Sequence, residues 1–263
     1  LMDRRQLLDR TAQNGEERIL LAHILDKCEQ CRNRNIPSAT DFLSPAEQRS
    51  AQELLHAAAI HDGYAFRGGY DRAERRMLLF LPDWQEEADE SEYMTALRCT
   101  YRKEDTLTHR DFLGSLMAQG ITREKLGDIL VSEGSTDLIV SRDMAPYLLQ
   151  NVTGAGRVKL LLSEIELSGL NVPELKVREI RDTVPTLRLA AGAASGFSMS
   201  RGKAQELISS GRVQLNHRET LKSDAPVAQG DVISARGLGK FEVAEVGGLS
   251  KKGRTALLLR RYL

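Results

Sequence analysis

The sequence has no long hydrophobic run. Its longest apolar stretches, such as Met77-Leu78-Leu79-Phe80-Leu81, are far shorter than the roughly 18 residues that a membrane-spanning helix requires. The first residues, Leu1-Met2-Asp3-Arg4-Arg5, lack the apolar core of a secretory signal peptide. We therefore expect a cytoplasmic protein with no membrane partner.

Cysteine is also scarce. The three cysteines among 263 residues are odd in number and too few for a disulfide framework, and they suit a reducing compartment. Cys28-x-x-Cys31 has the spacing of half a zinc site or of a redox pair, but no second Cys/His pair lies at suitable spacing. Because both residues continue a helical apolar stripe, we interpret them as core thiols and Cys99 as a third free thiol. We expect no metal and no cofactor.

The chain has no net charge either, because 37 Lys/Arg residues balance 37 Asp/Glu residues. This balance alone would argue against a nucleic-acid partner, but the charge is unevenly distributed. Residues 185–263 contain 13 basic and 6 acidic residues, a net charge of +7, and the residues before them carry −7. The asymmetry predicts a polyanionic partner for the C-terminal part and a different role for the rest.

The length favours two or three small domains. We expect residues 1–74 to form a helical N-terminal domain, because two segments carry helix-start signals. Asn14 is followed by Glu17, and Ser44-Pro45-Ala46-Glu47 combines an N-cap, a proline in the first turn and a capping-box glutamate. Each signal precedes a helical apolar pattern, and glycines at 63, 68 and 69 then mark a structured loop.

Residues 75–182 alternate between strand and helix periods. A strand at 77–81 and an acidic loop at 86–92 are followed by six elements in the order βαββαβ, with strands at 96–102, 127–131, 137–141 and 158–165 and helices at 109–119 and 143–151. This order predicts a ferredoxin-like (RRM-like) domain, in which two helices cover one face of an antiparallel sheet and the other face is available.

Standard RRM readout is not expected in this domain, because the strand at 137–141 lacks the aromatic residues that stack on bases. The alternation of the strand at 96–102 places Leu97 and Cys99 on one face and Arg98 and Arg102 on the other. The two arginines are candidates for phosphate contact, although an exposed polar face is the commoner explanation.

Residues 183–263 are predicted to form two short helices, the first ended by Gly196 and the second capped by Ser200, and then a small sheet with strands at 213–216, 232–235, 240–246 and 255–262. Arg201 and Lys203 flank the apolar face of the second helix in its first turn. Free N–H groups at a helix start favour phosphate. Cations there oppose the helix dipole, so a structural role explains them poorly.

The same segment resembles a known module. Ser200-Arg201-x-x-Ala204-x-x-x-Ile208-x-x-Gly211-x-Val213-x-x-Asn216 is similar to the signature of the S4 RNA-binding module of ribosomal protein S4, tyrosyl-tRNA synthetase tails and several enzymes acting on ribosomal RNA (rRNA), and Gly230-Asp231-x-Ile233 supplies its later part. Two positions depart from the family pattern: Ala190 stands where Asp is usual, and His217 replaces the frequent Gly.

The resemblance implies a C-terminal S4 αL-type RNA-binding domain and an α+β chain overall. Together with the charge pattern, it implies a set of RNA-contacting residues: Arg188, Ser200, Arg201, Lys203, Gln205, Arg212, Asn216, Lys222, Arg236 and Lys240.

Three segments further upstream look like hallmarks of the YlmH family: Gly68-Gly69-Tyr70-Asp71-Arg72-Ala73-Glu74-Arg75, Thr108-His109-Arg110-Asp111-Phe112-Leu113-Gly114 and Arg123-Glu124-Lys125-Leu126-Gly127-Asp128-Ile129-Leu130-Val131. This resemblance implies a bacterial ribosome-associated factor that binds a stalled large subunit carrying peptidyl-tRNA and assists ribosome quality control. The partners that it implies are rRNA of the large subunit, tRNA and other quality-control factors. Some members of the family have also been tied to cell division.

Two of the motifs also resemble catalytic or nucleotide-binding sequences. His109-Arg110-Asp111 superficially matches a kinase catalytic loop, but Leu116 stands where Asn is needed and no phosphate loop precedes it. Thr108 and Asp111 form a capping box instead, which leaves His109 and Arg110 exposed as secondary RNA-contact candidates. Gly237-Leu238-Gly239 indicates a hairpin turn rather than a dinucleotide site.

S4 modules also occur in rRNA- or tRNA-modifying enzymes, so an enzyme is the alternative from another class. We expect no catalytic site, because the upstream part lacks the doubly wound sheet and Gly-rich turn of a methyltransferase and is too short for a pseudouridine synthase. A scaffold for cell-division proteins is a third hypothesis, in which the acidic N-terminal half is the working surface.

Overall fold

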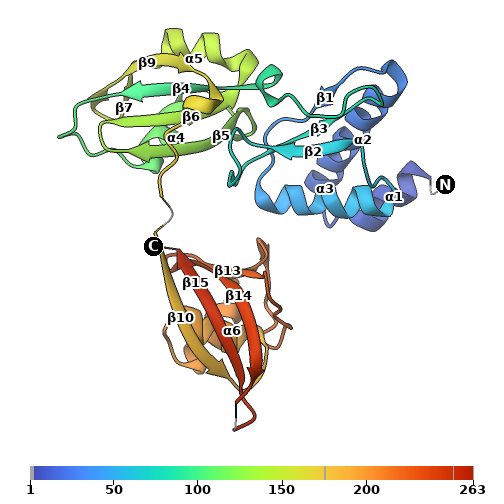
Figure 1. Ribbon diagram of the computed structural model, residues 1–263, viewed down its shortest axis with the longest axis vertical. Helices are drawn as coiled ribbons and strands as arrows, with labels where there is room; N and C mark the ends of the chain where they lie inside the picture. The colour runs from blue at the N-terminus through green and yellow to red at the C-terminus, as the bar shows by residue number, and fades with distance from the viewer. Residues whose placement is uncertain (1–2, 175, 251, 263) are drawn as a thin grey trace. The chain divides into compact units, whose positions relative to one another are not determined.

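The computed structural model describes residues 3–174, 176–250 and 252–262. The chain divides into two compact units, Leu1–Pro173 (unit 1) and Glu174–Leu263 (unit 2), and each is described by itself. The mixture of helices and strands confirms the predicted α+β class (Figure 1).

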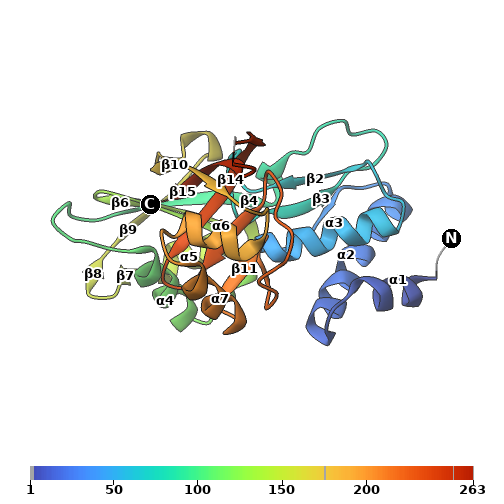
Figure 2. The same cartoon turned by 90° about the horizontal axis from the view of Figure 1, so that it is seen from below.

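Unit 1 begins with three helices, α1 (Arg4–Thr11), α2 (Gly15–Arg34) and α3 (Pro45–Ala57). Both predicted helix starts are confirmed, because the Asn14 side chain accepts a hydrogen bond from the Glu17 N–H and Ser44 forms a capping box with Glu47. The helices share a core with one face of a three-stranded sheet in the order β1 (Ser38–Ala39), β3 (Met77–Phe80), β2 (Tyr64–Arg67) (Figure 2).

This sheet corrects two expectations. Residues 64–67, expected to lie in a loop, form β2 and pair along their whole length with β3. Strand β3 was assigned to the middle region, but its register joins it to β1 and β2. Leu78 and Phe80 lie in the core of the N-terminal helices, so packing across sequence distance decided where this short apolar strand belongs.

The second half of unit 1 has the predicted ferredoxin-like order. It contains β4 (Met94–Thr100), α4 (His109–Ala118), β5 (Leu126–Ser132), β6 (Ser135–Ser141), α5 (Ala145–Asn151) and β9 (Leu161–Ile165). The four strands form an antiparallel sheet in the order β5-β6-β4-β9. The single strand expected at 158–165 is divided into β8 (Val158–Lys159), which pairs with β7 (Gly154–Ala155), and β9.

Apolar groups pack on both faces of this sheet. Leu97 and Cys99 pack with Phe112 of α4 and Leu148 of α5 on one face, as predicted. The other face was expected to be available, and that expectation is wrong for much of it: Met94, Leu130 and Ile139 are buried against a second set of apolar residues, Phe42, Met77 and Leu79. The three-stranded sheet therefore joins the N-terminal helices to the ferredoxin-like half.

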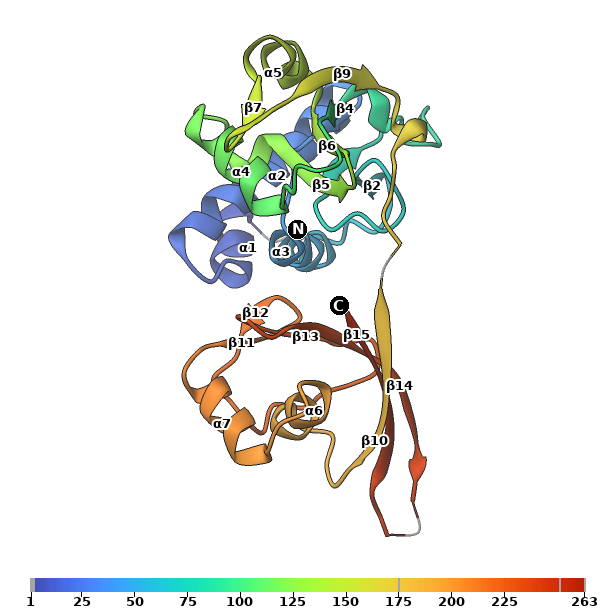
Figure 3. The same ribbon diagram turned by 90° about the vertical axis from the view of Figure 1, so that its left-hand side faces the viewer.

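Unit 2 is a helix pair on a six-stranded sheet. Its elements are β10 (Val177–Val184), α6 (Leu189–Gly196), α7 (Arg201–Ser209), β11 (Val213–Leu215), β12 (Arg218–Glu219), β13 (Val232–Ala235), β14 (Gly239–Leu249) and β15 (Thr255–Tyr262). The strand order is β10-β15-β14-β13-β11-β12, and Figure 3 shows both helices on the same side of the sheet. The two predicted helices and four predicted strands are confirmed.

Strand β10 is not predicted from the sequence. It pairs with β15 from Val177↔Tyr262 to Val184↔Thr255, so residues 177–182, expected in the middle domain, belong to the C-terminal sheet. The division between the two units lies correspondingly earlier, after Pro173.

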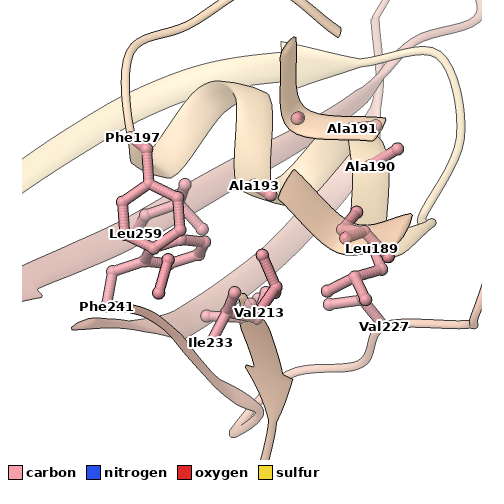
Figure 4. Packing of buried hydrophobic residues seen from close by; sticks show 14 of the residues in the cluster. Leu189, Ala190, Ala191, Ala193, Phe197, Val213, Val227, Ile233, Phe241 and Leu259 are labelled. Atoms are coloured by element: carbon pink, nitrogen blue, oxygen red, sulfur yellow. The ribbon is translucent and has the colours of Figure 1, made fainter. Parts of the chain in front are cut away.

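Figure 4 shows Phe197 beside Phe241 in the core of unit 2. Helix α6 lies close to the sheet at its last residue, Gly196. A Cβ atom at this position would lie 2.2 Å from the ring of Phe241, which is itself fully buried. Phe197 meets the same ring edge to face, with ring centroids 5.0 Å apart. Glycine is therefore required for packing at the end of α6.

We expect Gly196→Ala to lower the free energy of unfolding of unit 2 by about 2 kcal/mol, because the added methyl group overpacks the core. The matched control is Gly202→Ala in α7, where nothing lies within 4 Å of the added Cβ; it should be neutral or stabilise by up to about 1 kcal/mol. Urea unfolding followed by circular dichroism measures both. Equal effects of the two substitutions would contradict the packing argument.

Candidate nucleic-acid interface

Helix α7 presents its charged residues to solvent from a capped start. The Ser200 side chain accepts a hydrogen bond from the Lys203 N–H at 3.3 Å, as the sequence predicted. Ala204, Leu207 and Ile208 bury one face of the helix, and Arg201, Lys203 and Gln205 are exposed beside it. In the part of the chain that the structure describes, none of these three side chains has a hydrogen-bond or ion-pair partner within the protein.

Hydrogen bonds at the start of α6 hold the loop that carries Lys222. Arg188 is the N-cap residue of α6, and its Nη1 donates to the Asp224 carbonyl at 3.0 Å. The Leu189 and Ala190 N–H groups donate to the carbonyls of Ala225 and Ser223. These bonds fasten the loop that carries the exposed Lys222 beside Arg188.

Ala190, which departs from the family pattern, is 1% exposed in the core of unit 2. An ionised carboxylate at this apolar position would need partners of its own. Arg188 is positioned by the Asp224 carbonyl instead of by a neighbouring carboxylate.

Asn216 shapes the hairpin between β11 and β12. Asn216 and His217 both have positive φ angles, 51° and 65°, which a two-residue turn of this hand requires. The Asn216 amide donates to Asp231 Oδ1 at 2.8 Å, and its oxygen accepts from the Val232 N–H at 2.9 Å. The side chain predicted to contact RNA is thus already bonded within the protein, and its observed role is to fix the hairpin.

The remaining predicted cations lie around the β11–β13–β14 end of the sheet. Arg212 Nη2 donates to the Arg236 carbonyl at 3.3 Å, which brings the two residues together, and both are exposed. Lys240 is half-buried, its Nζ lies 5.3 Å from the centre of the Tyr262 ring, and burial lowers its pKa. The predicted cations of unit 2 thus lie in three places: at the start of α6, at the start of α7 and near this end of the sheet.

The secondary candidates in unit 1 differ in their surroundings. Arg98 donates from Nε and Nη2 to the two oxygens of Asp137, both at 2.8 Å, and Nη2 also reaches the Gly169 carbonyl. The Asp137 side chain is only 2% exposed, so this ion pair gives Arg98 a structural role. Arg102, His109 and Arg110 are exposed. Partial desolvation of the His109 ring, followed by the charge of Arg123, lowers the pKa of His109.

The cysteines are buried, as predicted. Cys28 and Cys31 lie in the core of the N-terminal helices and Cys99 in the core of the ferredoxin-like half. Burial raises the pKa of all three thiols, that of Cys99 to about 12, which disfavours the reactive thiolate. Among the described residues no group of three or more His, Cys, Asp or Glu side chains is arranged to hold a metal ion.

A polar junction in unit 1 was not foreseen. Asp128 accepts hydrogen bonds from the Tyr70 hydroxyl at 2.8 Å and from the N–H groups of Glu74 and Arg75 at 2.7 and 3.0 Å. Burial, then the Asp128 carboxylate, raises the pKa of Tyr70. Two of the family-like segments, residues 68–75 and 123–131, therefore bind each other, a relation that their sequence distance concealed.

The fold of unit 2 and its exposed cations define an S4-type RNA-binding protein. Residues 188–233 match the family model of the S4 domain, and residues 90–169 match the model described as a putative RNA-binding domain in YlmH. No helix in the described residues is long and apolar enough to cross a membrane.

A relative from Bacillus subtilis (strain 168), the ribosome-associated protein quality control protein P2, is 37% identical over 223 residues, which cover 84% of this chain and 86% of that protein. The solved structure of the cell division protein ylmH from Streptococcus pneumoniae is also similar, with 21% identity and a TM-score of 0.49, over 62% of this chain and 98% of that one. The chain belongs to the YlmH family of bacterial S4-domain RNA-binding proteins.

The ion pair of Arg98 yields a prediction that separates structure from RNA contact. We expect Arg98→Met to lower the free energy of unfolding by about 2 kcal/mol, because the substitution leaves the buried Asp137 carboxylate without its cation. The expected loss is smaller than that for a fully buried pair, since Arg98 is partly exposed to solvent. Binding to RNA should change little. Arg102→Met, at an exposed position, is the control for stability, and loss of RNA binding by a fully stable Arg98→Met protein would show that Arg98 contacts RNA.

Proposed function

We propose that this protein is a non-catalytic, cytoplasmic RNA-binding factor that associates with the large ribosomal subunit and peptidyl-tRNA. In this role it assists the rescue and quality control of stalled ribosomes. The observation that carries the proposal is the capped start of α7, where the Arg201 and Lys203 side chains have no partner within the described protein.

Phosphate binding accounts for that arrangement. Backbone N–H groups at a helix start and two adjacent cations suit a nucleic-acid backbone, and such contacts position a protein on RNA without reading sequence. Arg188 and Lys222 extend the charged surface from the start of α6. A relative named as a ribosome-associated quality control protein supports the ribosome as the source of this RNA, with rRNA, tRNA and other quality-control factors as partners.

The decisive test is charge reversal at the start of α7. The double variant Arg201→Glu, Lys203→Glu should lose association with large ribosomal subunits by at least about a hundredfold, because two phosphate contacts become repulsive. The fold should persist, since both side chains are exposed. Co-sedimentation over a range of KCl concentrations measures the effect, and wild-type binding must weaken as salt rises.

The matched control is Arg181→Glu, Arg260→Glu, which makes the same change of charge at exposed positions of β10 and β15 in unit 2. This variant should bind nearly as the wild type does. Undiminished co-sedimentation of the folded Arg201/Lys203 variant would overturn the proposal. Salt-insensitive capture of division proteins by that same variant would favour the scaffold hypothesis.

A further inference from the structure

Two half-buried guanidinium groups meet in unit 1. Arg75 Nε donates to the Leu126 carbonyl at 2.9 Å, and Arg123 Nη1 donates to the same oxygen at 3.0 Å. Arg75 Nη2 also reaches the carbonyls of Phe42 and Arg123, and Arg123 Nη1 reaches that of Gly127. Two like charges are therefore held next to each other by backbone oxygens.

No carboxylate neutralises this pair directly. Within the described residues, neither guanidinium group has an ion pair within 4.0 Å, and the bonds of Asp128 go to Tyr70 and to backbone N–H groups. Burial, followed by the charge of Arg75, lowers the pKa of Arg123 to about 10, and burial lowers that of Arg75. The carboxylates of Glu47, Asp128 and Glu124 offset part of the charge of Arg75 from a distance, and Asp128 does so for Arg123. Because none of them forms an ion pair with either guanidinium group in the described residues, an anion that reached a free donor edge would gain a charge-assisted hydrogen bond.

The free edge of Arg123 has the geometry that binds an anion in this same chain. Arg98 donates hydrogen bonds to the Asp137 carboxylate through Nε and Nη2, and Arg18 donates to Asp9 through the same two atoms. Arg123 makes its protein contacts through Nη1 alone, so its Nε–Nη2 edge is without a partner among the described residues. A planar edge with two parallel donors matches carboxylate or phosphate oxygens.

We propose that the Nε–Nη2 edge of Arg123, with the adjacent charge of Arg75, binds a backbone phosphate of RNA, as a contact additional to that of α7. The proposal rests on the proposed function, which supplies the RNA. The exposed His109 lies within the electrostatic influence of Arg123, so a polyanion, unlike a single carboxylate, could contact both side chains. Lys125 is not part of the site, since it is bonded to Asp41.

The test measures salt-dependent co-sedimentation of the full chain with purified bacterial large ribosomal subunits. Arg123→Gln should weaken binding about tenfold, through loss of a charge-assisted bond, and reduce the slope of log K against log salt by about one. Arg123→Lys keeps the charge but loses the planar edge, so it should keep the slope and still bind several-fold more weakly. Arg157→Gln, an exposed arginine in the β7–β8 turn, is the matched control and should bind as the wild type does.

Arg123 also supports backbone carbonyls, so thermal unfolding must accompany each binding curve. Should Arg123→Gln fail to fold, Arg123→Lys carries the test, and a folded Arg123→Lys protein with wild-type affinity would overturn the inference. Wild-type affinity and slope in a folded Arg123→Gln protein, or an equal loss in Arg157→Gln, would overturn the inference. The Arg201/Lys203 variant is measured in parallel. If only the Arg123→Gln protein binds normally, the inference fails alone, and if the Arg201/Lys203 variant also binds normally, the proposed function fails as well.

Discussion

The contact between Gly196 and Phe241 sets the geometry on which the RNA-binding surface depends. Because no side chain separates the end of α6 from the sheet, the chain can turn there, and Arg261 adds a bond to the Gly196 carbonyl and lies over the Phe197 ring. Ser198, with a φ angle of 55°, completes the turn two residues before the Ser200 cap. Packing in the core thus determines where α7 begins and how Arg201 and Lys203 are positioned. A substitution that disturbs this packing is therefore expected to affect both the stability of unit 2 and its proposed contact with RNA.

The two units differ in how often their cations form ion pairs within the protein. In unit 1, several cations are bonded within the protein, as Arg18 is to Asp9 and Arg98 to Asp137. In unit 2, Arg201 and Lys203 project from the start of α7 without a partner in the described residues, and Arg188 at the start of α6 donates to a backbone carbonyl but to no carboxylate. Exposed ion pairs contribute little to stability, so leaving these cations unpaired costs the fold little while keeping their charge available to a polyanion. The net neutrality of the whole chain hides this division of roles.

Local signals were sufficient where structure is local. The Ser200 cap, the Ser44 capping box and strands β13 and β15 follow from residues close in sequence. Strand β10 could not be found in this way, because it is an edge strand rich in charge and its partner lies more than seventy residues away. The covered face of the ferredoxin-like sheet and the Arg98–Asp137 pair also depend on tertiary contacts that no spacing reveals. Asn216 is a similar case in the site: its RNA contact stays a prediction from the motif, whereas its bond to Asp231 is a tertiary contact that the motif does not reveal.

The segments that most resemble the YlmH family serve the architecture first. A Cβ at Gly68 would lie 2.5 Å from the Arg75 carbonyl oxygen, and one at Gly127 would lie 2.9 Å from the Phe42 ring, so both glycines allow close approach of backbone or ring. Asp128 then ties residues 70–75 to β5 through three hydrogen bonds. This junction fixes the Arg75 backbone and leads its side chain to the carbonyl that Arg123 also binds. A structural device built on the half-buried Asp128 carboxylate therefore also places two cations side by side, neither of which forms a direct ion pair in the described residues. The same residues thus tie two parts of unit 1 together and present the Arg123 edge to which we assign a phosphate.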